Sequence, residues 1–175
     1  MPVTLLEHGQ TALILLDFQE KLVPVMAQSQ RTIDNVAALI HLSDLFHLPV
    51  ILAEQYPTWL GSTIPEIKKA LPAHDPRAQT AFNCCEAEGF NERIEAEKVR
   101  NILLLGLESH LCVFQKCFSL LKQGYMVYVP QDAVASRQKE NWRAGLDLMK
   151  EAGAVITSTE DVVYQIHNKN RNEPV

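Results

Sequence analysis

The sequence predicts an α/β fold in which a parallel sheet is covered by helices on both faces. Short runs rich in Val, Ile and Leu alternate with longer segments of helical period, a pattern typical of βαβ units. The first run, residues 11–16, is too uniformly apolar for a sheet with one face in water, so it belongs at the centre of the sheet. With 47% hydrophobic and 21% charged residues, the composition is that of a globular chain, and we expect one domain over residues 1–175.

Further apolar runs predict the other strands. Apolar residues at helical spacing, followed by a residue that stops a helix, predict the helices. Three helices end just before a residue that stops a helix: 29–47 before Pro49, 109–122 before Gly124 and 138–152 before Gly153. The further expected strands are 50–53, 78–82, 99–105, 125–129 and 155–156, and the further expected helices are 91–98 and 161–167.

Residues 55–76 carry five prolines and glycines, and they are predicted to form a long loop with one helical turn at 66–70. Loops of this length in compact domains usually have a function. We therefore expect part of the site in this region.

Charge and apolar content exclude several classes of partner. The net charge is −5 and the Lys and Arg residues are scattered, so no basic stripe is available for nucleic acid or anionic lipid. The N-terminus lacks the features of a secretion signal, and the longest apolar run, residues 12–16, is far short of the roughly 20 residues of a membrane span. These observations predict a cytoplasmic protein with no membrane partner.

The four cysteines, Cys84, Cys85, Cys112 and Cys117, have neither zinc-finger spacing nor the density of a disulfide scaffold. We expect free thiols. Cys117 is assigned to the core, whereas the vicinal pair Cys84 and Cys85 is open to two interpretations, packing or a redox disulfide.

Ligands of open parallel sheets bind at the carboxyl ends of the strands, where the strand order reverses. That rule selects Asp17 after the first strand, residues 54–56 after the second, and residues 107–112 after the strand that ends near Gly106. Asp17 and Cys112 are 95 positions apart in the sequence, yet neighbouring strand ends can bring them together across a crevice.

Cys112 lies near the first turn of the helix predicted to start at Ser109. The free backbone N–H groups of a helix start carry roughly half a positive charge, which favours a thiolate and provides donors for an oxyanion. Cys112 is therefore a candidate nucleophile. The alternative is that it is one more small residue packed against the sheet.

Asp17 also has two interpretations. An Asp at a strand end often caps the turn that follows. The apolar run before Asp17 would leave its carboxyl partly buried, which raises a carboxyl pKa and suits the group to accept a thiol proton. Together with Cys112, the second interpretation is favoured.

Four motifs in order give the chain a family resemblance. They are Leu-Leu-Asp-Phe-Gln at 15–19, Glu-Gln-Tyr-Pro at 54–57, Leu-Gly-Leu-Glu-Ser-His-Leu-Cys-Val at 105–113 and Asp-Ala-Val-Ala-Ser-Arg at 132–137. Over about residues 9–166 the chain resembles the isochorismatase-like cysteine hydrolases, and specifically their small isochorismatase-domain branch.

The resemblance implies a three-layer, Rossmann-like fold with a six-stranded parallel sheet, and a catalytic triad of Asp, Lys and Cys. Asp17 would be the general base, and Cys112 would attack the carbonyl of a small amide to form a thioester that water hydrolyses. A non-proline cis peptide would fall at Leu107–Glu108 and aim the N–H of Glu108, with that of Cys112, at the oxyanion. The isochorismatase proper lacks this cysteine and cleaves an enol ether, so Cys112 argues against that reaction. No cofactor is implied.

This chain has a different residue at the position of the family's lysine. The lysine usually precedes Thr-x-Phe, and Gln79 stands there. A neutral amide can orient a substrate but supplies no charge to a thiolate or an anionic intermediate. Arg77, two residues away, is an alternative source of charge. The departure opens a second function, a catalytically weak or inactive binding or scaffolding protein.

Metal binding is not expected. Nicotinamidases of the superfamily carry an Asp-x-His ligand pattern after the second strand, where this chain has Glu54-Gln55-Tyr56, and His74 is the only nearby imidazole. A nicotinamidase is correspondingly disfavoured.

Aromatic residues near the predicted crevice are candidate walls of a substrate pocket. Phe18, Tyr56 and Trp59 could enclose a small planar molecule, or they could be ordinary core or dimer contacts. The apolar residues 56–60 and the resemblance predict a homodimer or homotetramer that acts on a small-molecule substrate.

Overall fold

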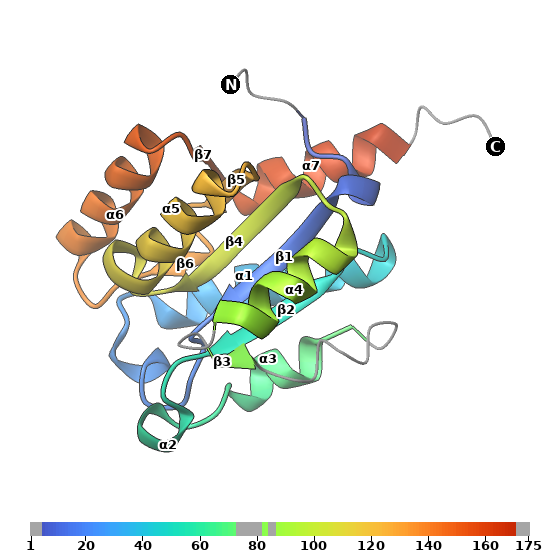
Figure 1. Ribbon diagram of the computed structural model, residues 1–175. Coiled ribbons are helices and arrows are strands. Elements are labelled where there is room, and N and C mark those ends of the chain that lie inside the picture. Colours follow the sequence, from blue (N-terminus) through green and yellow to red (C-terminus); the bar gives the residue numbers. More distant parts are fainter. Residues whose placement is uncertain (1–4, 73–81, 84–86, 171–175) are drawn as a thin grey trace.

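The computed structural model describes residues 5–72, 82–83 and 87–170, and its centre is a parallel sheet (Figure 1). Six strands follow one another across the sheet: β3 (Phe82–Asn83), β2 (Val50–Glu54), β1 (Thr11–Leu16), β4 (Asn101–Leu107), β5 (Met126–Pro130) and β7 (Val155–Thr157). A two-residue strand, β6 (Val134–Ala135), adds to the end of β4. All these pairings are parallel, which confirms the predicted six-stranded parallel sheet.

Strand β1 is the central strand, as its composition predicts. Its six residues are all buried, and it pairs with β2 on one side and β4 on the other, with Leu16 opposite Ala53 and Gly106. The strand order reverses between β1 and β4, so the carboxyl ends of β1, β2 and β4 lie at a switch point.

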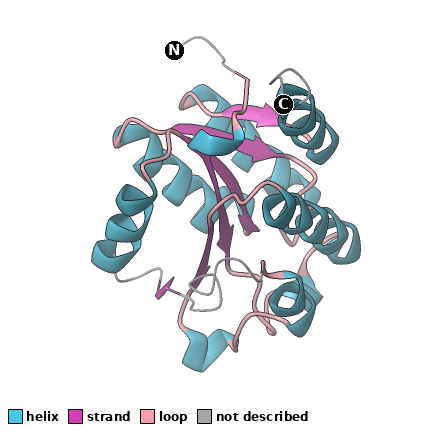
Figure 2. Cartoon of the chain, turned by 90° about the vertical axis from the view of Figure 1, so that its right-hand side faces the viewer, coloured by secondary structure: helices cyan, strands magenta, loops and turns pink. Residues whose placement is uncertain are grey.

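Helices cover both faces of the sheet, and Figure 2 shows them on either side of the strands. One layer contains α1 (Ser29–Leu45), α3 (Pro65–Ala70) and α7 (Thr159–Asn170), and the other contains α4 (Ala87–Glu97), α5 (Phe114–Lys122) and α6 (Lys139–Glu151). Because side chains alternate along a strand, Leu13 and Leu15 pack in the first layer, whereas Ile14 and Leu16 pack in the second. Cys117 lies fully buried in the second layer, which confirms its assignment to the core.

The predicted long loop contains two short helices instead of one helical turn. They are α2 (Pro57–Leu60) and α3, and each begins at a proline, whose fixed φ and missing N–H suit the first helical position. Single turns of 3₁₀ helix, η1 (His8–Gln10) and η2 (Val23–Val25), flank β1.

Among the other boundaries that differ from the prediction, two lie near the site. Strand β3 spans only Phe82–Asn83, and residues 78–81 of the strand predicted at 78–82 lie outside the described part. The helix predicted at 109–122 divides into a π-helical turn, η4 (Ser109–Val113), and α5. Within the described ranges, no helix is long and apolar enough to cross a bilayer.

Candidate active site

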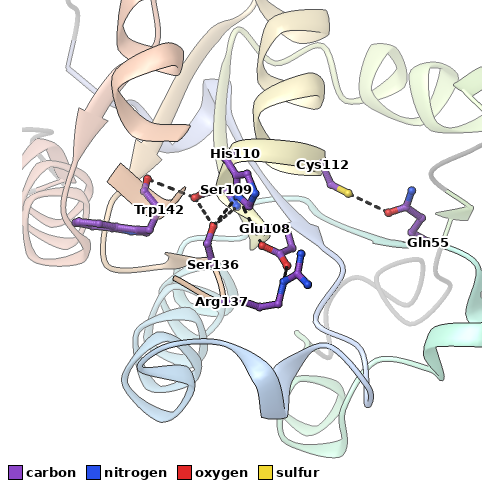
Figure 3. A network of polar contacts seen from close by, with 8 residues as sticks. All are labelled: Gln55, Glu108, Ser109, His110, Cys112, Ser136, Arg137 and Trp142. Carbon is purple, nitrogen blue, oxygen red and sulfur yellow. Dashed lines mark hydrogen bonds and ion pairs between the residues drawn. The ribbon is translucent and has the colours of Figure 1, made fainter. Parts of the chain in front are cut away.

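The structure brings Asp17 and Cys112 together at the carboxyl ends of β1 and β4. Asp17 follows β1, is fully buried, and its backbone N–H donates to Ala53 O at 3.0 Å. Cys112 lies in η4, with its thiol within hydrogen-bond reach of the Asp17 carboxylate. From the end of β2, Gln55 places Oε1 2.9 Å from Cys112 Sγ (Figure 3). Three strand ends therefore converge on one sulfur atom.

The surroundings of Cys112 keep its thiol protonated at rest. The pKa of Cys112 is raised from 9.0 to about 12, mainly by burial and then by the charge and hydrogen bond of Asp17 and the charge of Glu108. The residue's own backbone N–H lowers the pKa, but by less. The expectation that a helix start would hold a resting thiolate is therefore wrong, because burial and two carboxylates outweigh the N–H groups. An attack by this sulfur needs a base, and Asp17 is in place.

Three residues that follow strands adopt the left-handed backbone conformation that side chains rarely tolerate. They are Asp17 (φ 63°), Tyr56 (φ 43°) and Glu108 (φ 58°), after β1, β2 and β4. Such conformations concentrate at functional sites, where the surrounding structure imposes them. At Glu108 this turn replaces the expected cis peptide: the Leu107–Glu108 bond is trans, and the chain reverses at the left-handed residue instead.

A network of hydroxyl groups fixes the start of η4. Ser136, which follows β6, accepts a hydrogen bond from the Ser109 N–H at 3.0 Å, and its Oγ lies 2.7 Å from Ser109 Oγ and 3.1 Å from His110 Nδ1 (Figure 3). Arg137 Nε donates to Glu108 Oε1 at 2.5 Å. Both serines are buried, so the end of β6 anchors the turn that carries Cys112.

Helix α6 packs against the same turn through a glycine. A Cβ atom at Gly145 would lie 2.6 Å from Ser109 C, 2.7 Å from His110 N and 2.8 Å from Ser109 O, all backbone atoms. The two backbones can approach this closely only because residue 145 has no side chain.

We expect Gly145→Ala to lower the free energy of unfolding by about 1–3 kcal/mol, because the added methyl group overpacks this contact. Urea denaturation measures the change. The matched control is Gly9→Ala, since a Cβ at Gly9 would meet nothing within 4 Å. Equal effects of the two substitutions would contradict the close approach of α6 to η4.

Gln19 ties the loop after β1 to the loop after β2. It is fully buried, its Nε2 donates to Gln55 O at 3.0 Å and Gly61 O at 2.6 Å, and its Oε1 accepts from Gln55 N at 2.9 Å. From the sequence, Gln55 is expected at the strand ends only as part of residues 54–56, and Gln19 has no predicted role. The available signal was their place in the motifs at 15–19 and 54–57, directly after buried strands.

A shallow hollow of about 400 Å³ lies just beyond the end of β2. Gln55, Tyr56, Trp59 and Leu60 line it, so Gln55 connects the hollow with Cys112. Tyr56 is 55% exposed and Trp59 76% exposed. Phe18, the third predicted pocket wall, is instead fully buried in the layer of α1, α3 and α7, and its ring offers no surface to a ligand.

Some predicted residues lie outside the described part of the chain: Arg77, Gln79 and His74, together with the cysteine pair Cys84 and Cys85. In the part that the structure describes, no three His, Cys, Asp or Glu side chains are placed to hold a metal ion.

Comparison with known proteins identifies relatives of the whole chain. The isochorismatase domain model matches residues 11–161. The chain is 32% identical to the secreted isochorismatase effector Isc1 of Phytophthora sojae, over 96% of this chain and 81% of that protein. It is 31% identical to isochorismatase domain-containing protein 2 of Pongo abelii, over 90% and 76% of the two chains.

Solved structures of related proteins have the same fold as this chain. The structure of MAR1 ribonuclease from Caenorhabditis elegans superposes with a TM-score of 0.83 at 30% identity, covering 93% of this chain and 84% of that one. The YcaC gene product of Escherichia coli, described as an octameric hydrolase of unknown specificity, gives 0.86 at 25% identity over 99% and 87%. The α/β sheet, the converging strand ends and these matches lead to one conclusion: the chain belongs to the isochorismatase family, whose members include hydrolases.

Proposed function

We propose that this protein is a cysteine hydrolase of a small amide or a related carbonyl compound. One observation carries the proposal: the Cys112 thiol lies within hydrogen-bond reach of the buried carboxylate of Asp17. A nucleophile beside a base is the minimum arrangement for covalent catalysis of acyl transfer. Membership in the isochorismatase family supports hydrolysis as the class of reaction.

The reaction begins when Asp17 takes the thiol proton as Cys112 Sγ forms a bond to the carbonyl carbon of the substrate. The electron pair of the C=O bond moves to oxygen, where the N–H groups of Glu108 and Cys112 are the proposed donors. The carbonyl reforms as the bond to the leaving amine breaks, and the amine receives the proton from Asp17. Water, deprotonated by Asp17, then hydrolyses the thioester and restores the thiol.

Gln79 limits how fast this cycle runs. The family resemblance places a lysine ammonium at this position, and an amide cannot provide that charge. Without that ammonium, the thiolate formed during attack depends for stabilisation on the substrate, on backbone N–H groups or on Arg77, the alternative source of charge. We therefore infer a slow hydrolase, in which Gln79 orients the substrate by hydrogen bonds.

We also propose that the chain forms a single catalytic domain that assembles as a homodimer or homotetramer. The exposed Tyr56 and Trp59 offer apolar surface for assembly, and the related Escherichia coli protein is described as octameric. A cytoplasmic location stays a prediction from the sequence, and the relative from Phytophthora sojae is named as secreted.

An activated acyl compound tests the mechanism without knowledge of the natural substrate. We expect p-nitrophenyl acetate to release a burst of p-nitrophenol equal to the enzyme concentration, followed by slower turnover, because the acetyl thioester forms before it is hydrolysed. Acid quenching and mass spectrometry locate the acetyl group. Trypsin cleaves after Arg100, Lys116 and Lys122, so Cys112 and Cys117 fall in different peptides.

An acetyl group on the peptide 101–116 that disappears with the rate of the slow phase supports the mechanism. Acetylation elsewhere, or an acetyl group on Cys112 that never hydrolyses, would contradict it. A panel of small amides and hydroxamates, assayed with freshly reduced protein, then identifies the substrate.

A further inference from the structure

Gln55 contacts the reacting sulfur atom directly. Its Oε1 lies 2.9 Å from Cys112 Sγ, where the thiol can donate a hydrogen bond to it (Figure 3). The Asp17 carboxylate is a second acceptor for the same thiol. A thiol has one hydrogen, so it donates to only one of these two oxygen atoms at a time. The two acceptors therefore compete for the S–H group.

Attack on a substrate needs the S–H group to point at Asp17, because the proton passes to that carboxylate. Gln55 Oε1 then faces the sulfur with no hydrogen between the two atoms, and their lone pairs repel each other at 2.9 Å. The amide of Gln55 also carries an NH₂ group, which takes the place of the oxygen when the amide turns about the last side-chain bond. An NH₂ group donates hydrogen bonds, and a thiolate accepts them.

The backbone of Gln55 is held in place, so the response to the thiolate falls to its side chain. Nε2 of the fully buried Gln19 donates to Gln55 O at 3.0 Å and to Gly61 O at 2.6 Å, and Gln19 Oε1 accepts from Gln55 N at 2.9 Å. The backbone N–H of Glu20 donates to Ser62 O at 3.0 Å, which ties the same two loops together. Gln55 itself is only partly buried and borders the hollow, so its amide has room to turn.

We propose, building on the hydrolase function above, that Gln55 is a catalytic residue that changes from hydrogen-bond acceptor to donor during the attack. At rest its amide oxygen accepts from the Cys112 thiol. Once Asp17 has taken the proton, the amide turns over and its N–H donates to the sulfur. No proton leaves Gln55 in this step. Gln19 is the positioning residue, because it holds the backbone from which the amide reaches the sulfur.

Gln55→Met tests the donor, because methionine has nearly the same length and no N–H group in its side chain. Loss of a donor to the thiolate raises the pKa of Cys112 and lowers the thiolate fraction at every pH below it. At a fixed mildly alkaline pH, we expect iodoacetamide to alkylate the peptide 101–116 about 10-fold more slowly in this variant, as for the loss of a hydrogen bond to a charged group.

The opposite result has a clear meaning. If Gln55 only accepts from the thiol, its loss removes an interaction of the protonated form, and Cys112 becomes easier to ionise. Alkylation of Gln55→Met would then be faster than in the parent protein. A faster or unchanged rate would overturn the donor role.

Reagent size separates the thiolate fraction from access to the sulfur. A lower thiolate fraction slows iodoacetamide and the bulkier N-ethylmaleimide by the same factor, which is the expected result. A decrease confined to the bulkier reagent would mean a blocked path and would overturn the proposal. Gln123→Met is the matched control, since Gln123 is exposed and follows the last residue of α5, and it should leave both rates unchanged.

A double-mutant cycle tests the positioning role of Gln19. Gln19→Met should slow alkylation by about 2- to 5-fold in the parent protein and cause no further decrease in Gln55→Met, because its effect passes through Gln55. Equal decreases in the two backgrounds would contradict this role. Circular dichroism checks that each variant is folded, and Gln19→Asn replaces Gln19→Met if the latter does not fold.

Acylation by p-nitrophenyl acetate separates this inference from the proposed function. In Gln55→Met the burst of p-nitrophenol should develop about 10-fold more slowly, because the attacking thiolate is less stable. A burst of unchanged rate would overturn the role of Gln55 and leave Cys112 as the nucleophile. If the parent protein gives neither a burst nor an acetyl group on Cys112, the proposed hydrolase function fails instead.

Discussion

Replacing Cys112 by alanine should lower turnover of any substrate by about 10⁴-fold or more, because the residue that forms the covalent intermediate is removed. The same substitution should eliminate alkylation of the peptide 101–116 by iodoacetamide. Steady-state kinetics and peptide mapping measure the two effects. The fold should persist, since Cys112 is only partly buried.

The matched control is Cys117→Ala, the same change one turn further along the chain. Cys117 is fully buried in the helix layer of α4, α5 and α6, so this variant should lose stability but keep activity while folded. If Cys112→Ala retains the turnover of the parent protein, Cys112 is not the nucleophile.

Replacing Asp17 by asparagine should change two observable rates in opposite directions. Turnover should fall by about 10²- to 10⁴-fold, because no base remains to take the thiol proton. Alkylation of Cys112 at a fixed mildly alkaline pH should become faster. The charge of Asp17 and its hydrogen bond raise the pKa of Cys112, so their loss lowers that pKa and increases the thiolate fraction at every pH below it.

The dependence of the alkylation rate on pH shows in which direction Asp17 shifts the pKa of Cys112. In the parent protein the rate should still be rising above pH 9, as expected for a pKa of about 12, and in Asp17→Asn the whole profile should move to lower pH. Asp34→Asn, on the exposed side of α1, is the control and should leave both rates unchanged. Parallel loss of turnover and alkylation would mean that Asp17 promotes the thiolate, contrary to the geometry described above.

The sequence predicts the framework well because burial on two faces leaves a strong pattern. The bounds predicted for the central strand, residues 11–16, match the structure, since only a strand covered on both sides is as continuously apolar as residues 12–16. The meeting of Asp17 and Cys112 follows from the same argument, because parallel strands present their carboxyl ends at one edge. Boundaries near the site are less predictable: the π-helical turn at Ser109–Val113 has the composition of an ordinary helix start.

The electrostatics of the site could not be read from the sequence. A helix start near Cys112 favours a thiolate, but the sign of the shift depends on burial and on the distances to Asp17 and Glu108, which only the folded chain fixes. The left-handed conformations of Asp17, Tyr56 and Glu108 are equally invisible, because none of these residues is glycine. The prediction of Phe18 as a pocket wall is wrong for a related reason. Directly after a buried strand, a shift of one position decides whether a side chain points into the interior or toward the crevice.

Pairing of β1 with β4 joins segments that are distant along the chain, and this has a consequence for the way chemical reactivity develops during folding. In a newly made or unfolded chain, the Cys112 thiol has the ordinary pKa of a cysteine, 9.0. In the folded chain, where β1 pairs with β4, burial and the charges of Asp17 and Glu108 raise that pKa to about 12. We therefore expect the unfolded polypeptide to react faster with oxidants and alkylating agents at this position than the folded protein does, because the fold shields the sulfur atom.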